Sequence, residues 1–237
     1  YYLIPVCTPE LITGEGCAQT LAQPLLDRGV THTLVVTDSG LSRLGLPDGM
    51  VESLQAAGLS VTVYDGVQPN PTDEDVEDGL QLYRDAGCDG IIAFGGGSPM
   101  DCAKAIGARV VRPKRTIAKM QGLFGVLHRL PPFFAVPTTA GTGSETTLAA
   151  VITDSATHHK ASINDPSLIP HVAVLDPALT MGLPPAVTAA TGMDALCHAV
   201  EAYTNHTYCT KLENRMAKEA VRLIHKYLPQ AYANGSD

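Results

Sequence analysis

Short apolar runs alternate with amphipathic stretches along most of the chain. Five runs have the length and continuous apolarity of strands that are buried on both faces: residues 33–37, 61–64, 90–94, 133–136 and 172–175. Helical patterns separate several of them, at residues 50–57, 73–86 and 98–110. This regular alternation predicts an α/β fold, a parallel sheet covered by helices on both faces, with ligand-binding loops at the carboxyl ends of the strands.

The pattern changes in the last third of the chain. Residues 151–154 and 160–163 are predicted to form a hairpin, with His158 and His159 in a solvated turn at its tip. From residue 185 onward the pattern is helical only, at 185–203 and 210–227. We therefore expect an α/β domain at residues 1–181, opening with an edge strand or extended segment that reaches Cys7, and the beginning of an all-α domain at 182–237.

Composition excludes several classes of function. The 24 acidic and 16 basic residues give a net charge of −8, which argues against a nucleic-acid partner. The six cysteines are scattered without a C-x-x-C pair, so free thiols in a cytoplasmic protein are expected. No apolar run approaches the length of a membrane span, and the first residues lack the pattern of a signal peptide.

A glycine loop follows the apolar run at 90–94. Gly95, Gly96 and Gly97 lead into a helix for which Ser98 is the predicted N-cap, with Pro99 at the first position and the carboxylate of Asp101 completing a capping box. The start of such a helix offers free N–H groups and partial positive charge, so it is suited to a pyrophosphate. Met100 stands where the usual dinucleotide fingerprint has its third glycine.

A second polar loop follows the run at 133–136. Thr138, Thr139, Thr142 and Ser144 offer hydroxyl groups to a small polar ligand, and the two glycines among them let the backbone approach it. A solvent-exposed turn without a ligand is the alternative.

Two carboxylates are further candidates. Asp38 ends a predicted strand, where it could accept hydrogen bonds from ribose hydroxyls and repel a 2′-phosphate, which favours NAD over NADP; a helix or turn cap is the alternative. Asp194 and His198 lie four residues apart on one face of a predicted helix and could bind one cation. A surface or capping pair is the alternative for these two.

Taken in this order, the segments resemble the iron-containing (group III) alcohol dehydrogenase family. The matching residues are Asp38, 69–72, 95–99 with Asp101, 137–145 and 192–203, and the resemblance extends over nearly the whole chain. It implies a Rossmann-like parallel sheet followed by a helical domain, the dehydroquinate synthase-like fold. It also implies hydride transfer between a small-molecule alcohol and an aldehyde or ketone, with NAD (NADP as the alternative) and Fe(II) (Zn(II) as the alternative).

The resemblance also implies roles for individual residues. Asp194 and His198 would bind the metal and, with Lys160, would be catalytic; Lys160 reaches into the cofactor cleft in the family, and a plain surface lysine is its alternative. The implied cofactor-binding residues are Asp38, Asn70, Gly95, Gly96, Gly97, Ser98, Asp101, Thr138, Thr139, Thr142, Ser144, Thr147, Val151, Lys160 and Leu179.

The sequence departs from the family in its metal-binding histidines, and this departure leaves other functions open. Family members bind the metal with two further histidines in a longer helical domain, and His206 and His225 do not lie in matching contexts, so a truncated metal site is expected. The alternatives are an NAD-binding fragment without turnover and a metalloenzyme similar to glycerol dehydrogenase or dehydroquinate synthase. A homo-oligomer is expected from the family.

Overall fold

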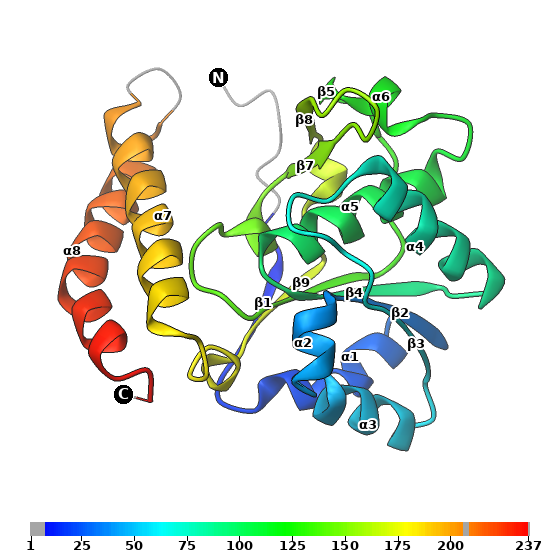
Figure 1. Cartoon of the computed structure of the whole chain (residues 1–237), viewed down its shortest axis with the longest axis horizontal. Coiled ribbons are helices and arrows are strands. Elements are labelled where there is room, and N and C mark those ends of the chain that lie inside the picture. The colour runs from blue at the N-terminus through cyan, green and yellow to red at the C-terminus, as the bar shows by residue number, and fades with distance from the viewer. Residues whose placement is uncertain (1–7, 206–208, 237) are drawn as a thin grey trace. The chain divides into compact units, whose positions relative to one another are not determined.

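The computed structural model describes residues 8–205 and 209–236 (Figure 1), which divide into two compact units. The first unit contains the chain up to Pro137 together with Ser144–Asp176. The second contains Thr138–Gly143 and the chain from Pro177 onward. The edge strand expected to reach Cys7 lies outside the described residues. The domain boundary expected at residue 182 stays a prediction.

The first unit is built on a sheet of six parallel strands, in the order β1-β9-β6-β4-β2-β3. The central strands are continuous apolar runs, and every residue of β4 is buried, as expected for strands covered on both faces. The predicted parallel sheet is confirmed. Its strands are β1 (Glu10–Thr13), β2 (His32–Val36), β3 (Ser60–Tyr64), β4 (Gly90–Gly95), β6 (Phe133–Pro137) and β9 (Val172–Leu175).

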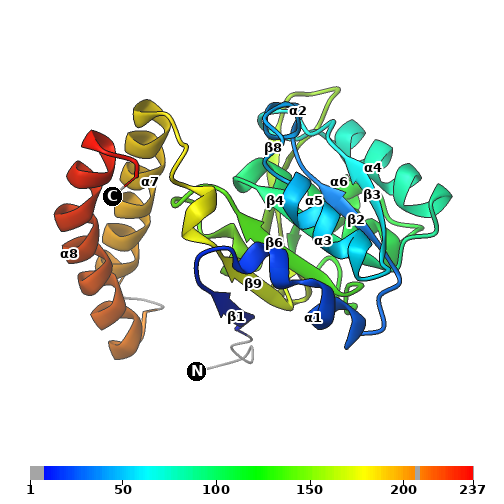
Figure 2. The same ribbon diagram turned by 90° about the horizontal axis from the view of Figure 1, so that it is seen from below.

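Helices cover both faces of this sheet. Figures 1 and 2 show α1 and α3 on one face and α4 and α5 on the other. Ile91, Ala93 and Ile106 lie in the main core cluster under α4 and α5. The helices are α1 (Ala22–Leu26), α2 (Ser39–Arg43), α3 (Asp48–Ala56), α4 (Asp73–Asp85), α5 (Gly97–Val111) and α6 (Ile117–Met120), with short 3₁₀ helices at Cys17–Thr20, Ser144–Thr146 and Pro166–Leu168.

The strand order places a topological switch point between β2 and β4. The chain passes from β2 to β3 on one side and then crosses to β4 on the other side of β2. In open parallel sheets, ligands bind outside the carboxyl ends of the strands at such a point. Asp38 follows β2, and Gly95 ends β4, so two of the predicted cofactor residues lie at this edge.

A small second sheet contains the predicted hairpin. Strands β7 (Ala149–Thr153) and β8 (Lys160–Asn164) are antiparallel, and β5 (Gly122–Leu123) pairs in parallel with β8. His158 and His159 are exposed at the hairpin tip, as expected. The hairpin prediction is confirmed.

The predicted start of helix α5 is wrong. The helix begins at Gly97 with Gly96 as its N-cap, and no side chain caps it. The hydroxyl of Ser98 instead accepts a hydrogen bond from the backbone N–H of Asn70. The carboxylate of Asp101 accepts from the Ser144 hydroxyl and the Val151 N–H, so it does not complete a capping box. Local capping rules failed because both side chains bind segments that are distant in sequence.

The second unit contains the helices α7 (Pro185–Thr204) and α8 (Lys211–Ala233), preceded by a 3₁₀ turn at Pro177–Leu179. Thr210 and Glu213 form a capping box at the start of α8, which continues through Pro229 beyond the predicted end. The two helices pack closely at Gly192, where a Cβ atom would approach within 2.3 Å of Leu228 Cδ1. Among the described residues, none of the helices combines the length and apolarity needed to cross a bilayer.

Candidate functional site

The glycine loop at the end of β4 packs closely against its neighbours. Gly95 has φ +146°, and a Cβ at this residue would lie 2.7 Å from Pro99 Cγ and 3.1 Å from Leu41 Cδ1. Only glycine fits there without displacement of its neighbours. Because Leu41 belongs to α2, the same distance shows that the turn after β2 lies beside the turn after β4.

The first turn of α5 has the features of a phosphate-binding helix start. Its N-cap is a glycine, no side chain caps it, and Gly96, Gly97 and Ser98 are partly exposed. The first N–H groups of a helix have no partner within the helix, and the dipole places partial positive charge there. A diphosphate group fits this end of α5.

Asp38 has the cap geometry that was the alternative interpretation. Its Oδ1 accepts hydrogen bonds from the N–H groups of Gly40 (2.9 Å) and Leu41 (3.0 Å), so it is the N-cap of α2. Within the described residues, no hydrogen bond to its Oδ2 is seen. A carboxylate can accept from more than one donor, so the cap leaves an oxygen for ribose hydroxyls. The role in cofactor choice stays a prediction.

Three of the predicted residues meet beside this loop. Lys160 Nζ donates to Asn70 Oδ1 at 2.6 Å, and the Asn70 N–H donates to Ser98 Oγ at 3.3 Å. Asn70 has φ +59°, a conformation that asparagine tolerates better than most residues. The structure thus brings residues from α5, the 65–72 loop and β8 together, with Lys160 exposed.

A second group of predicted residues lies around Asp101. Burial raises the pKa of its carboxyl group, and hydrogen bonds from Val151 N–H and the Ser144 hydroxyl, with the charge of Lys104, oppose that shift. The hydroxyls of Ser144 and Thr147 both lie at 3.0 Å from Lys104 Nζ, so they bind the protein interior.

Lys104 is a residue that the sequence analysis missed. It is fully buried, and its ammonium also donates to three backbone carbonyls of the same segment. The signal was present: Lys104 is a charged residue inside the otherwise apolar stretch 102–108 of a helix. A charged side chain at such a position is buried only when it is paired or hydrogen-bonded.

The remaining predicted residues belong to the second unit. Thr138 is buried, Thr142 is exposed, and Thr139 and Leu179 are partly exposed. The loop carrying the threonines lies against α7, because a Cβ at Gly141 would lie 2.9 Å from Thr191 O. The structure therefore shows this loop beside the helix that carries Asp194 and His198.

Asp194 and His198 lie on one face of α7, as predicted. His198 Nε2 is 3.7 Å from Asp194 Oδ2, and both side chains are about half exposed. A carboxylate oxygen and an imidazole nitrogen suit a first-row divalent ion, so this pair fits part of a metal site. Within the described ranges, no group of three or more His, Cys, Asp or Glu side chains is arranged to hold a metal. His206 lies outside those ranges.

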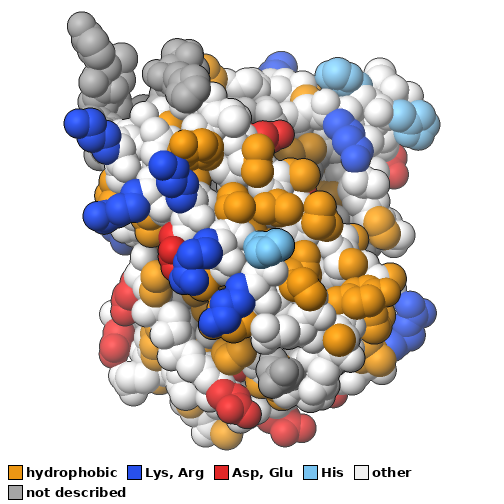
Figure 3. Space-filling view, turned by 90° about the vertical axis from the view of Figure 1, so that its left-hand side faces the viewer, with side chains coloured by type: hydrophobic (Ala, Val, Ile, Leu, Met, Phe, Trp, Pro, Cys, Tyr) orange, Lys and Arg blue, Asp and Glu red, His pale blue; other side chains and the backbone are white. Residues whose placement is uncertain are grey.

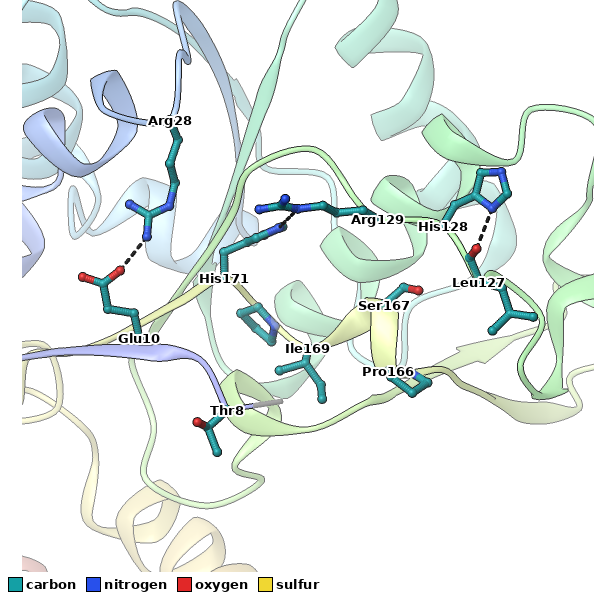
Figure 4. Close-up of a pocket in the computed structure, with 11 residues that line it drawn as sticks. Thr8, Glu10, Arg28, Leu127, His128, Arg129, Pro166, Ser167, Ile169 and His171 are labelled. Carbon is teal, nitrogen blue, oxygen red and sulfur yellow. Dashed lines mark hydrogen bonds and ion pairs between the residues drawn. The ribbon is translucent and has the colours of Figure 1, made fainter. Parts of the chain in front are cut away.

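A separate hollow of about 710 Å³ lies at the opposite edge of the main sheet (Figure 4). It is lined at the amino ends of the strands by Glu10, which pairs with Arg28, and by His171, which accepts a hydrogen bond from Arg129 Nε at 3.2 Å. Burial and the two nearby arginines lower the pKa of His171. None of the predicted cofactor or metal residues lines this hollow.

Comparison with known proteins places the chain in a family. The sequence profile described as "Iron-containing alcohol dehydrogenase" matches residues 8–177, and the profile of the family's C-terminal part matches residues 188–237. The chain belongs to the iron-containing alcohol dehydrogenase family. The resemblance drawn from the sequence motifs is therefore confirmed, and so is the Rossmann-like parallel sheet followed by helices.

Several relatives of this family member are enzymes whose names state an alcohol substrate. It is 41% identical to an NAD-dependent methanol dehydrogenase of Bacillus methanolicus over 97% of this chain and 60% of the relative. It is 43% identical to a 1,3-propanediol dehydrogenase of Klebsiella pneumoniae over 95% of this chain and 56% of the relative. The chain thus spans about 60% or less of these two relatives.

Solved structures agree with this assignment. A 1,3-propanediol oxidoreductase structure is 39% identical and superposes with a TM-score of 0.94, over 99% of this chain and 61% of that one. A sulfoacetaldehyde reductase from Bifidobacterium kashiwanohense in complex with NAD+ is 31% identical and superposes with a TM-score of 0.88, over 99% of this chain and 62% of that one.

Proposed function

We propose that this family member takes part in NAD-dependent, metal-assisted interconversion of a small alcohol and its aldehyde or ketone. The observation that carries the proposal is the loop after β4. Gly95 holds a backbone conformation that excludes a side chain, and the uncapped start of α5 follows it at the switch point of the sheet.

The residues around this loop would hold the two halves of the cofactor in order. The start of α5 would bind the diphosphate, and Asp38 would bind the adenosine ribose, which favours NAD over NADP. Lys160, hydrogen-bonded to Asn70 and exposed, would face the nicotinamide ribose or the substrate. One relative is named as NAD-dependent, and another has a solved structure in complex with NAD+, which supports this choice of cofactor.

Asp194 and His198 would hold the metal, Fe(II) or Zn(II). Their donor chemistry fits such an ion, although the described residues supply only this pair. A divalent ion bound to an alcohol supplies Lewis acidity that lowers the pKa of the hydroxyl group. The names of the relatives, methanol and 1,3-propanediol dehydrogenases, support a small primary alcohol as the substrate class.

The main alternative function is NAD binding without turnover by this chain. It is favoured by one observation, the absence of a third metal-binding side chain beside Asp194 and His198 among the described residues. Catalytic metal sites in proteins usually have three protein ligands.

Metal stoichiometry and turnover together test these functions. The chain would be purified without oxygen, reconstituted with Fe(II) or Zn(II), and assayed for bound metal and for NADH formation from methanol and 1,3-propanediol. We expect one ion per chain and alcohol-dependent NADH formation, and we expect His198→Ala to lose both. His225→Ala is the matched control, because His225 is an exposed histidine on α8 with no predicted role.

Two results would separate the alternatives. NADH binding without bound metal or turnover would support the cofactor-binding fragment over the dehydrogenase. Stoichiometric metal retained in His198→Ala would contradict the proposed metal site.

A further inference from the structure

Lys104 makes five side-chain hydrogen bonds, and no proposed catalytic step uses it. It lies on α5, three residues after Asp101, with none of its surface exposed. Its Nζ lies within 3.0 Å of five oxygen atoms, which all belong to the segment from Ser144 to Ala149. One ammonium group therefore holds a six-residue segment against the helix.

The chemistry of these five oxygens requires a charged lysine. Three are backbone carbonyls, of Ser144 (2.7 Å), Thr147 (2.9 Å) and Ala149 (2.9 Å), and a carbonyl can only accept. An ammonium has three N–H groups, one for each of them, whereas a neutral amine has two. Loss of the proton therefore leaves at least one buried carbonyl without this donor.

The segment held by Lys104 carries one partner of Asp101, Ser144, and lies next to the other, Val151. Ser144 Oγ donates to Asp101 Oδ1 at 2.9 Å, and the Val151 N–H donates to Asp101 Oδ2 at 3.0 Å. Ser144, Thr147, Val151 and Asp101 are all predicted cofactor residues. Lys104 itself has no surface with which to touch a ligand, so its effect on the ligand must act through them.

We propose that Lys104 is a positioning residue of the cofactor site, whose buried ammonium fixes the 144–149 segment and thereby the arrangement of Asp101 and Val151. The proposal rests on the proposed NAD-binding function and specifies which side chain keeps that site in its binding-competent conformation. Because these hydrogen bonds depend on the proton of Lys104, we expect cofactor binding to be sensitive to alkaline pH.

The surroundings of Lys104 set the pH range of this sensitivity. Burial lowers its pKa to about 8, and the carboxylates of Asp101 and Glu145, which face it from α5 and from the 3₁₀ helix at Ser144–Thr146, oppose the shift. Burial raises the pKa of both carboxyl groups, and the positive charge of Lys104 opposes that shift. With its pKa at about 8, Lys104 loses its proton in mildly alkaline solution.

The first test is the affinity for NADH, measured by the fluorescence of the bound nicotinamide. Lys104→Met keeps the length of the side chain and removes its charge. We expect its Kd for NADH to rise about tenfold at pH 7, as for the loss of one charge-assisted interaction. The matched control is Lys114→Met at an exposed lysine, for which we expect the Kd of the unsubstituted protein.

The pH dependence separates positioning from a general loss of structure. The Kd of the unsubstituted protein should rise as the pH is increased through about 8, and that of Lys104→Met should stay at its high value throughout. Equal affinity of the two proteins at pH 7, or the same pH dependence in both, would overturn the proposal. If Lys104→Met does not fold, a Kd of the unsubstituted protein that is constant from about pH 7 to about pH 9.5 would overturn it.

Hydrogen exchange in the absence of cofactor tests whether Lys104 fixes the 144–149 segment, independently of the proposed function. We expect Lys104→Met to exchange the amides of residues 144–151 faster than the unsubstituted protein at the same pH, with α4 unchanged. Equal exchange rates in the two proteins would show that Lys104 does not fix this segment, whether or not NADH binds. If the variant exchanges faster but the unsubstituted protein does not bind NADH, the cofactor role is contradicted. The role of Lys104 in fixing the segment is then still supported.

Discussion

At the scale of single residues, several charged side chains of the first unit bind the backbone rather than another charged group. Asp176 accepts hydrogen bonds from the N–H groups of Gly16 and Ala18, and Asp89 accepts from those of Thr31 and His32. Lys104 does the same with carbonyl groups. Each of these side chains fixes a loop at one edge of the sheet, and a buried charge needs such partners to offset its lost hydration.

Asp165 gives the clearest prediction from this group. It is fully buried and accepts hydrogen bonds at 2.9 Å from the N–H groups of Val126, Leu127 and Ser167. Burial alone would raise the pKa of its carboxyl group, but these donors outweigh it and hold the pKa below the usual value. Its contribution to stability is therefore present above the pKa of the unfolded chain and is lost as the pH falls through the folded-state pKa.

We expect Asp165→Asn to lower the free energy of unfolding by about 1–3 kcal/mol near neutral pH, because an amide NH₂ would then face backbone donors. The difference from the unsubstituted protein should shrink at acidic pH, where Asp165 is protonated. Urea unfolding at neutral and acidic pH measures both effects. Asp154→Asn, in the exposed turn of the hairpin, is the control and should have the smaller effect. An undiminished difference in acid would contradict the assigned role.

Asp38 has two roles that can be separated by substitution. Serine at an N-cap still accepts from the first N–H groups of a helix, so Asp38→Ser keeps the cap of α2 and removes the charge. We expect the ratio of NADP to NAD affinity to rise roughly tenfold, since the repulsion of a 2′-phosphate is lost. Measured Kd values for NADPH and NADH test this, with Asp85→Ser at the end of α4 as control. An unchanged ratio would mean that Asp38 is only a cap.

At the scale of elements, α5 connects the fold to the predicted cofactor site. Its first turn follows the glycine loop, Asp101 and Lys104 in its next turns bind the 144–151 segment, and its apolar face packs on β4. Its close packing with α4 depends on Gly79, where a Cβ would lie 2.5 Å from Ile106 Cδ1. One helix therefore serves the core and the site at the same time.

The pairing of α7 with α8 gives a prediction at this scale. A methyl group at Gly192 would approach Leu228 Cδ1 within 2.3 Å, so Gly192→Ala requires Leu228 to move. We expect a loss of about 1–3 kcal/mol in the free energy of unfolding, from overpacking, measured by urea denaturation followed by circular dichroism. Gly182→Ala is the control, since no atom lies within 4 Å of its added methyl group.

A double-mutant cycle sharpens this prediction. Adding Leu228→Ala to Gly192→Ala removes the side chain that is in the way, so the double variant should be more stable than the sum of the two single losses predicts. Additive losses would show that the two residues are not in close packing contact.

At the scale of the whole molecule, the second unit carries apolar side chains on its surface. Leu212, Met216, Tyr227 and Tyr232 of α8 are exposed, each by about half of its area or more, and Figure 3 shows apolar groups gathered on the face seen there. Exposed apolar groups gathered in this way are typical of a contact surface. The predicted homo-oligomer and the cytoplasmic location stay predictions.

Much of the architecture was predictable because it depends on local patterns. The apolar runs of β2, β4, β6 and β9 marked strands whose two faces are both buried, and their alternation with amphipathic stretches implied parallel pairing. The spacing of Asp194 and His198 was sufficient to place them on one face of α7. Periodicity and short spacing are properties of the chain itself, so they survive folding unchanged.

The arrangement around α5 depended on tertiary structure. A capping rule assigned Ser98 and Asp101 to the start of the helix, but Ser98 binds Asn70 and Asp101 binds Ser144 and Val151. Partners that are tens of residues apart leave no periodic signal. The apolar stretch around Lys104 indicated a buried charge, but it did not indicate which segment would supply its hydrogen bonds. Folding brought the segment at 144–149 to Lys104, and the cost of leaving that charge without hydrogen bonds then selected the arrangement that is observed.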